Sequence, residues 1–387
     1  MVEKTFELEL DRLADSVNRE IRSQLDAALR QAAGREDAGV RRVYESVYDY
    51  LGNGGKRMHG VSVILAFRAV GGRPLEAILP VAAGFQLYHH HTLVHDDIYD
   101  QDDLRRGLPT LHRAFADWYG PLLRYSLPEM TNPIFAGAAE RVGAVAAWAQ
   151  GKIVHALAFE SIFSAPFRSD TLFEVARRVN HHDLTDNAGQ IMDVLHEGLG
   201  ASSPKKCLEI ARIKTARLFA TGVECAAILG GASESQIEFL SSWIEKVATA
   251  YQLQDDLNDL EPDSEKGKGR GVGTDLLSAK PTYLVALAKE RATGTTREVL
   301  NQWQADRCSD QITIEQVVRA IEEVGALRAC RGKAEELVEE GGAMLDRASP
   351  ALPREEVEFM RQFGAYFMSA NYWNRDLPVQ RAALQHV

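Results

Sequence analysis

Two acidic clusters in this chain share one spacing. Residues 96–100 read Asp-Asp-Ile-Tyr-Asp and residues 255–259 read Asp-Asp-Leu-Asn-Asp, so each cluster places carboxylates at positions i, i+1 and i+4. On a helix, residues four apart stand on one face, one turn from each other. Two such faces opposed across a cavity would bind hard divalent cations, and those cations would bind a diphosphate. The spacing therefore indicates chemistry on a diphosphate ester.

Basic residues follow each acidic cluster. Arg105 and Arg106 come shortly after the first cluster, and Lys266, Lys268 and Lys280 follow the second. Guanidinium and ammonium groups suit a phosphate that a metal ion binds from its other side. A single acidic run is usually a solvated helix face. Two runs of identical spacing, each with basic residues beyond it, favour the phosphate-binding interpretation.

A glycine-rich turn precedes the first cluster. Residues 54–57 read Gly-Gly-Lys-Arg and lead into an expected helix. Backbone N–H groups at a helix start favour anions, and Lys56 adds positive charge. The spacing before this lysine is wrong for a P-loop. A Gly-Gly-Lys triplet is also common by chance, so by itself it is a weak indication.

Several histidines lie just before the first cluster. His91 and His95 have the i, i+4 spacing of a zinc-binding pair, but no His-Glu-x-x-His motif occurs, and the neighbouring carboxylates prefer a harder ion. Donation to a phosphate is the better interpretation for His89. His181 and His182 are expected to be surface or capping residues. No Gly-x-Ser-x-Gly elbow and no reactive-looking cysteine indicates a nucleophile.

The composition is that of a globular protein. The 387 residues are 45% apolar and 26% charged, which allows a large core. A net charge of -11 argues against nucleic acid as the main partner. Four scattered cysteines favour buried, reduced thiols. We expect a cytoplasmic protein without a transmembrane segment, because no signal-peptide pattern occurs and no apolar run approaches the roughly 20 residues of a span.

Helical periodicity dominates the chain. Apolar residues at positions 6, 10, 13, 17, 21, 25 and 29 predict an amphipathic helix over about residues 4–33. A second helix should end at Gly71-Gly72, and the next should start near Leu75 and carry the first cluster at its end. Ser203-Pro204 predicts a helix start, residues 235–259 a helix that ends in the second cluster, and residues 313–316 a capping box. Residues 120–134 and 261–274 are predicted loops.

No segment alternates as a strand would. We therefore expect one all-α domain over residues 1–387, with roughly a dozen helices around a central active-site cavity. Its motif-bearing core would span about residues 40–290, and its C-terminal helices about residues 295–375.

The region over roughly residues 40–290 resembles the trans-isoprenyl diphosphate synthases of the polyprenyl synthetase family, such as farnesyl and geranylgeranyl diphosphate synthases. Residues 95–110 match the first aspartate-rich motif of that family almost throughout, and residues 251–259 match the second. The shorter family motifs are matched by Gly189-Gln190 with Asp193, by Lys214-Thr215, by Gly267-Lys268 and by Lys280-Pro281-Thr282.

The resemblance implies an isoprenoid-synthase-type helical bundle, a homodimer and a prenyltransferase that condenses isopentenyl diphosphate with an allylic diphosphate. It implies Mg²⁺ as cofactor, with about three ions per site and with Mn²⁺ as a substitute. The implied metal ligands are Asp96, Asp97, Asp100, Asp255 and Asp259. The residues implied to bind the allylic diphosphate and its cation are Arg105, Lys214, Thr215, Gln252 and Lys268. Those implied to bind isopentenyl diphosphate are Lys56, Arg57, His59, His89 and Arg106.

The chain also departs from the family pattern. His59 stands where the family has an arginine that binds isopentenyl diphosphate, Gly151-Lys152 replaces a Gly-Asp pair, and residues 113–150 are longer than the family norm. The aspartate-rich motifs, which ionise the allylic diphosphate in the resembling family, are intact. An alternative is therefore a terpene cyclase or atypical prenyltransferase that ionises an allylic diphosphate without normal addition of isopentenyl diphosphate. A regulatory subunit is disfavoured because both clusters are present. A calcium-binding helical protein is disfavoured because no EF-hand loop occurs.

The helix before Asp96 predicts the product length. In the resembling family, bulk at the fifth and fourth positions before the first aspartate sets the floor of the product cavity, and here these are His91 and Thr92. Tyr88, about one turn further down, is the first large ring that would close the tunnel. The alternative is a Tyr88 that only packs between helices. The sequence predicts a short product of C15 to C20.

Overall fold

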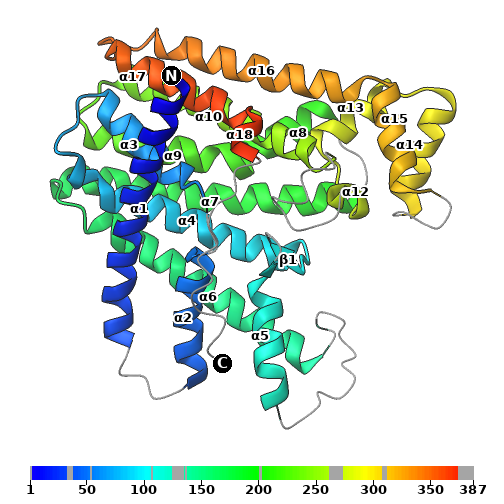
Figure 1. Cartoon of the computed structure of the whole chain (residues 1–387), viewed down its shortest axis with the longest axis horizontal. Helices are drawn as coiled ribbons and strands as arrows, with labels where there is room; N and C mark the ends of the chain where they lie inside the picture. Colours follow the sequence, from blue (N-terminus) through cyan, green and yellow to red (C-terminus); the bar gives the residue numbers. More distant parts are fainter. Residues whose placement is uncertain are drawn as a thin grey trace. The chain divides into compact units, whose positions relative to one another are not determined.

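The computed structural model describes residues 2–32, 38–52, 55–105, 108–123, 135, 137–199, 203–260, 273–306 and 312–373. Helices dominate this part of the chain, which confirms the predicted all-α class (Figure 1). The described strands are β1 (Leu104–Arg105) and β2 (Leu108–Pro109), which form one antiparallel pair. The helices exceed the expected dozen, because short ones such as α12 (Thr274–Leu277) and α18 (Ala370–Trp373) are too brief to show periodicity.

The chain forms two compact units. The first draws its described residues from 1–64 and 74–167, and the second from 65–73 and 168–373. The single domain over residues 1–387, with the subdivision stated above, stays a prediction.

The first unit begins with the predicted amphipathic helix. This is α1 (Val2–Ala32), and its residues Phe6, Leu10, Leu13, Val17, Ile21 and Leu25 are buried. The side chain of Leu29 lies outside the described residues. α1 packs against α2 (Ala38–Gly52) and α4 (Leu79–Tyr99). The 3-10 turn η1 (Leu75–Ile78) leads into α4, so the helix that carries the first acidic cluster starts near the predicted position.

The remaining helices of this unit surround α4. They are α3 (Met58–Ala69), whose last residues belong to the second unit, α5 (Leu111–Tyr119), the 3-10 turn η2 (Gly120–Leu122) and α6 (Ala138–Phe163). α6 packs along both α4 and α5 (Figure 1). A Cβ atom on Gly84 of α4 would lie 2.4 Å from Ile162 Cγ1 and 2.7 Å from the carbonyl oxygen of Ala158. Only a glycine lets the two backbones approach this closely.

α6 is long and apolar enough, by length and composition, to cross a membrane. The expectation that no apolar run approaches the length of a span was therefore wrong for residues 138–163. α6 nevertheless contacts α2, α4 and α5. A single helix of this kind is a weak indication of a membrane protein, since core helices pass the same test.

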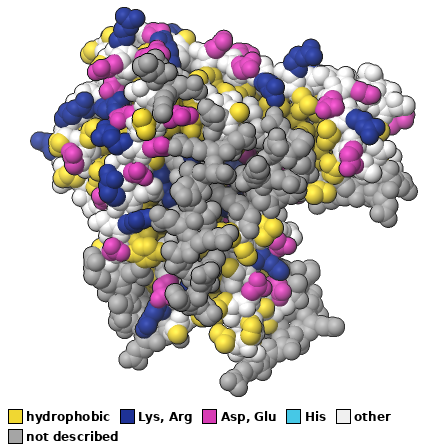
Figure 2. Space-filling view, in the orientation of Figure 1, with side chains coloured by type: hydrophobic (Ala, Val, Ile, Leu, Met, Phe, Trp, Pro, Cys, Tyr) yellow, Lys and Arg dark blue, Asp and Glu magenta, His cyan; other side chains and the backbone are white. Residues whose placement is uncertain are grey.

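The second unit is arranged around α10 (Glu234–Asn258), the helix that carries the second acidic cluster. α10 packs against α9 (Arg217–Leu229), α16 (Ala326–Leu345) and α17 (Arg354–Phe367). The other elements are α7 (Ser169–Leu199), α8 (Pro204–Ala211), the π-helical turn η3 (Arg212–Ala216), α13 (Tyr283–Arg291), α14 (Gly294–Asp306) and α15 (Ile314–Glu323). Figure 2 shows Lys, Arg, Asp and Glu side chains intermingled over its visible face around α14–α16, as on a solvated surface.

The predicted helix caps are confirmed. The Ser203 hydroxyl accepts a hydrogen bond from the Lys206 backbone N–H at the start of α8, and Thr313 with Gln316 forms the capping box of α15. A second capping box, Ser233 with Gln236, opens α10 and was not predicted. These bonds satisfy N–H groups that have no partner within the helix.

Other expectations have mixed outcomes. Cys207, Cys225 and Cys330 are buried free thiols, as predicted, whereas Cys308 lies outside the described residues. Most of the predicted loops, residues 124–134 and 261–272, also lie outside them.

The prediction that His182 is a surface or capping residue was wrong, because this side chain is 3% exposed. Burial, together with Arg217, lowers the pKa of His182 to about 4, so this ring is neutral at pH 7.

The close approach of α4 and α6 can be tested at Gly84. Gly84→Ala should lower the free energy of unfolding by about 1–3 kcal/mol, because the new methyl group would overlap Ile162 and the Ala158 carbonyl. Urea unfolding followed by circular dichroism measures this change. Gly198→Ala is the matched control, since a Cβ there meets nothing within 4 Å and alanine favours a helix. Equal stability of Gly84→Ala and the wild type would contradict the packing.

Candidate functional site

The first acidic cluster forms the last turn of α4. Asp96 is half-buried, Asp97 is 1% exposed, and Asp100 is the exposed C-cap residue, whose backbone N–H donates to the Asp96 carbonyl over 2.8 Å. Asp96 and Asp100 thus lie one turn apart, as their spacing predicted. Clustered carboxylate oxygens are the donors that hard divalent cations prefer, so these residues fit Mg²⁺.

Arg105 is held against this cluster. The β1–β2 pair places it so that its Nη2 lies 2.5 Å and its Nε 2.7 Å from Asp97 Oδ1. Burial would lower the pKa of Arg105, but Tyr50, Asp97 and Asp96 outweigh burial and hold that pKa above its usual value. A permanent cation therefore stands beside the predicted metal ligands. Arg106 lies outside the described residues.

The glycine-rich turn holds Arg57 in a buried position. Its Nε donates to Asn18 Oδ1 over 2.6 Å, and its Nη2 donates to the Leu51 carbonyl over 2.6 Å. Its Nη1 lies 3.3 Å from His90 Nε2. Arg57 therefore joins α1, α2 and α4 at the base of α3, and these contacts give it a role in holding the turn. Its predicted contact with substrate stays a prediction, as does that of the neighbouring Lys56, which is half-buried.

His59 and His89 lie together. Their rings, from α3 and α4, stack with centroids 4.1 Å apart and planes 20° apart. His59 is 7% exposed and His89 is half-buried. The structure thus brings together two residues that the sequence predicted for one diphosphate. Two stacked imidazolium ions repel each other, so an adjacent anion would be needed to favour the charged forms.

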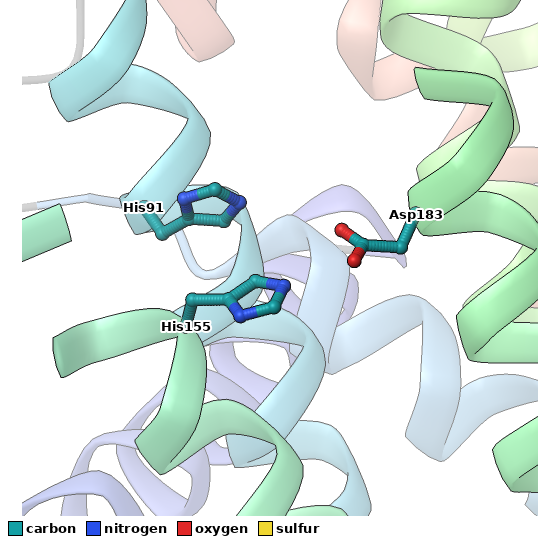
Figure 3. A group of neighbouring side chains, drawn as sticks. All are labelled: His91, His155 and Asp183. Carbon is teal, nitrogen blue, oxygen red and sulfur yellow. The ribbon is translucent and has the colours of Figure 1, made fainter. Parts of the chain in front are cut away.

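An aromatic group lies between α4 and α6. Tyr88 is fully buried, with ring centroids 5.1 Å from His91 and 5.3 Å from His155. The rings of His91 and His155 lie 4.6 Å apart, and Figure 3 shows both. Asp183, also labelled there, belongs to α7 of the second unit. Sequence reasoning found Tyr88 and His91 but missed His155, because only the packing of α6 on α4 brings that ring to them.

The second acidic cluster ends α10. Asp255 is half-buried and Asp259, the C-cap residue, is 2% exposed. The Asp259 carbonyl accepts from the Gly273 N–H over 2.7 Å, and its Oδ2 accepts from the Asp275 N–H over 3.0 Å. Asp259 therefore also fixes the start of α12. Asp255 and Asp259 lie one turn apart, so both clusters have the predicted arrangement at the end of a helix.

Lys214 and Thr215 lie on the π-helical turn η3. A π turn widens a helix locally and often marks a functional site. Lys214 Nζ lies 2.8 Å and Lys280 Nζ 3.7 Å from Asp193 Oδ2 on α7. Burial raises the pKa of Asp193, but Lys280 and Lys214 together outweigh burial and hold that pKa below its usual value. α7 can approach η3 because a Cβ on Gly189 would lie 2.6 Å from Ile213 Cγ2.

A short chain of hydrogen bonds links η3 to α10. The Thr215 hydroxyl donates to Gln252 Oε1 over 2.9 Å, and Gln252 Nε2 donates to Asp256 Oδ1 over 3.1 Å. Sequence reasoning named Thr215 and Gln252 as site residues but not Asp256 or Asp193. The family motifs around Asp193 and the second cluster were the available signals. Lys268 lies outside the described residues.

Known proteins match this chain over most of its length. The family model described as polyprenyl synthetase matches residues 41–321. A geranylgeranyl diphosphate synthase of Methanosarcina mazei is 30% identical over 328 residues, 82% of this chain and 87% of the relative. A geranylfarnesyl diphosphate synthase of Natronomonas pharaonis is 28% identical over 84% of this chain and 89% of that relative.

A solved structure shares the fold. It is a geranylgeranyl pyrophosphate synthase from Corynebacterium glutamicum complexed with isoprenyl diphosphate and magnesium. Its TM-score is 0.82 at 24% identity, and the match covers 93% of this chain and 99% of that one. The likeness confirms the predicted helical fold.

The histidine at position 59 should make the site sensitive to pH. If His59 binds isopentenyl diphosphate, the KM for that substrate should rise between pH 6 and pH 8, because histidine loses its charge above its ordinary pKa of about 6.5. Arginine keeps its charge throughout this range and binds phosphate through two bonds. His59→Arg should therefore lower the KM and flatten its pH dependence in steady-state kinetics.

His181→Arg is the control for this experiment, because His181 is an exposed histidine on α7 of the second unit. It should leave the KM and its pH profile as in the wild type. An unchanged KM in His59→Arg would show that His59 does not bind the substrate.

Proposed function

The chain belongs to the polyprenyl synthetase family and is a trans-prenyltransferase, and we propose that it condenses isopentenyl diphosphate with an allylic diphosphate to a product of C15 to C20. The observation that carries the proposal is the pair of aspartate clusters at the ends of α4 and α10, each with basic residues beside or beyond it. The relatives named above are synthases of isoprenyl diphosphates, which does not favour the cyclase alternative.

Prenyltransferases of this family depend on a metal ion, and we propose Mg²⁺, with about three ions per site and with Mn²⁺ as a substitute. The proposed ligands are Asp96, Asp97, Asp100, Asp255 and Asp259, whose oxygen donors suit a hard cation. When bound, the metal neutralises charge that develops on the leaving diphosphate.

The chain's own cations complete the binding of the allylic diphosphate. Arg105 is fixed by Asp97, and Lys214 is fixed by Asp193, so neither has to be ordered during the reaction. Lys268 would contact the same diphosphate. As the C–O bond breaks, its electron pair stays on the diphosphate and an allylic cation forms. The Thr215 oxygen would stabilise that cation, and Gln252 would contact the diphosphate.

The second substrate attacks the cation. Lys56, Arg57, His59, His89 and Arg106 form its proposed site, where the diphosphate group is held and the double bond is directed at the cation. The electron pair of the double bond forms the new C–C bond, and a proton leaves to the released diphosphate, so no protein base is required. Apolar side chains around the proposed site would keep water from the cation.

We also propose a cytoplasmic homodimer. Leu184, Ile191, Val194, Leu195 and Leu199 form an exposed apolar row on α7, of the kind that marks protein interfaces. The free thiols of Cys207, Cys225 and Cys330 suit a reducing compartment.

The purified protein should be incubated with Mg²⁺, isopentenyl diphosphate and, in turn, C5, C10 and C15 allylic diphosphates. Mass spectrometry of the products should show C15 to C20 diphosphates. Asp96→Ala and Asp255→Ala should each reduce activity by several orders of magnitude while circular dichroism stays unchanged, because each removes a ligand from a site where metal supplies most of the charge stabilisation.

Other outcomes of this assay are distinguishable. Release of diphosphate from the allylic substrate without consumption of isopentenyl diphosphate would support the cyclase alternative instead. Near-wild-type turnover of either aspartate variant at saturating Mg²⁺ would contradict the metal-site assignment, and lost helicity would give that residue a structural role.

The aromatic group between α4 and α6 should set the length of the prenyl product. Tyr88→Ala should lengthen the product by at least one C5 unit, because it removes the buried ring that contacts His91 and His155. His91→Phe should shorten it. Phe173→Ala is the control, an equal truncation of an exposed ring on α7. A wild-type product of C30 or longer would show that other residues form the floor of the product cavity. An unchanged distribution of product lengths in Tyr88→Ala would show the same.

A further inference from the structure

Asp256 lies between two proposed metal ligands but has a partner within the protein. It follows Asp255 on α10 and precedes Asp259 by three residues, and it is 8% exposed. Successive residues on a helix point about 100° apart, so Asp256 points away from Asp255, although it remains a neighbour of Asp259 three residues later. It shares the face of Gln252, one turn earlier, and its Oδ1 accepts from Gln252 Nε2 over 3.1 Å.

This contact fixes the orientation of the Gln252 amide. A carboxylate offers only acceptors, so the amide must turn its NH₂ group toward Asp256 and its oxygen the other way. Burial and Asp275 raise the pKa of Asp256, and in the structure its Oδ1 is the acceptor of the Gln252 NH₂ group. The amide oxygen then lies 2.9 Å from Thr215 Oγ1. Because that oxygen is an acceptor, the Thr215 hydroxyl is the donor.

The direction of this last bond decides what Thr215 presents to a substrate. When its proton points at Gln252, the remaining lone pairs of Oγ1 point away from Gln252 and can stabilise a cation. If the Gln252 amide were reversed, its NH₂ group would donate to Oγ1, and the hydroxyl proton would point outward instead. The dipole presented to an allylic cation would then have the opposite sign.

We propose that Asp256 is a positioning residue, which acts through Gln252 to keep the Thr215 oxygen lone pairs toward the allylic cation, and that it is not a ligand of the metal. This inference rests on the proposed function, because it requires an allylic cation at Thr215. It gives different roles to the aspartates of one cluster. Asp255 and Asp259 would bind the metal, whereas Asp256 would help to stabilise the allylic cation through Gln252 and Thr215.

Asp256→Asn tests this role with little change of shape. An asparagine can donate as well as accept, so Gln252 is no longer held in one orientation. The rate of ionisation, measured as diphosphate release from the allylic substrate, should fall roughly tenfold or more. The KM for the allylic diphosphate and the Mg²⁺ concentration for half-maximal activity should stay unchanged. Asp255→Asn is the matched control and should raise that Mg²⁺ concentration.

A double variant distinguishes positioning from a general structural effect. Thr215→Val removes the hydroxyl group, so adding Asp256→Asn to it should cause no further loss of rate. Thr215→Ser keeps the hydroxyl group and should restore the sensitivity to Asp256→Asn. Unfolding midpoints of all variants show whether the fold is retained.

Three results would overturn the proposal: a raised Mg²⁺ requirement in Asp256→Asn, losses that multiply in the double variant, or an unchanged ionisation rate in Asp256→Asn. A separate result would contradict the proposed function. In that case the wild-type protein ionises the allylic diphosphate, but with isopentenyl diphosphate it does not form a prenyl product longer than the substrate.

Discussion

Carboxylates at the carboxyl end of a helix are electrostatically unfavourable, and this chain places two clusters of them there. Asp96–Asp100 end α4 and Asp255–Asp259 end α10, where the helix dipole is negative and the carboxylates repel one another. Such an arrangement persists only where positive charge or N–H donors offset the repulsion. The surrounding structure supplies both, because Arg105 binds Asp97 and the Asp275 N–H binds Asp259. The unfavourable charge that remains favours a cation at each helix end.

Three basic side chains are themselves held by carboxylates. Asp193 lies beside both Lys214 and Lys280, and Asp97 lies beside Arg105. A long side chain that is already ordered loses less entropy when it binds a phosphate. These carboxylates therefore prepare the cations for an anionic substrate, although they reduce the net charge of the site.

Close helix packing places the other site residues. Gly84 lets α4 approach α6, so Tyr88, His91 and His155 form one group, and Gly189 lets α7 approach η3 beside Lys214. These glycines act through the space that they leave open. The π turn at η3 has a related effect, since it shifts the register of the helix at Lys214 and Thr215. The chemistry of the site thus depends on backbone features several residues away from the reacting groups.

The sequence by itself determined the helical class, the start and end of the motif-bearing helices, the caps at Ser203 and Thr313, and the position of both acidic clusters at helix ends. All of these follow from local spacing, since residues three and four apart lie together on any helix. The stack of His59 on His89, the buried contacts of Arg57, the pairing of Asp193 with two lysines and the contact of Thr215 with Gln252 were decided by tertiary structure. Each joins helices that are distant in sequence, and their contact depends on packing that no local pattern records. His182 shows the same limit, because a polar residue on α7 is buried only through the neighbours that pack on it.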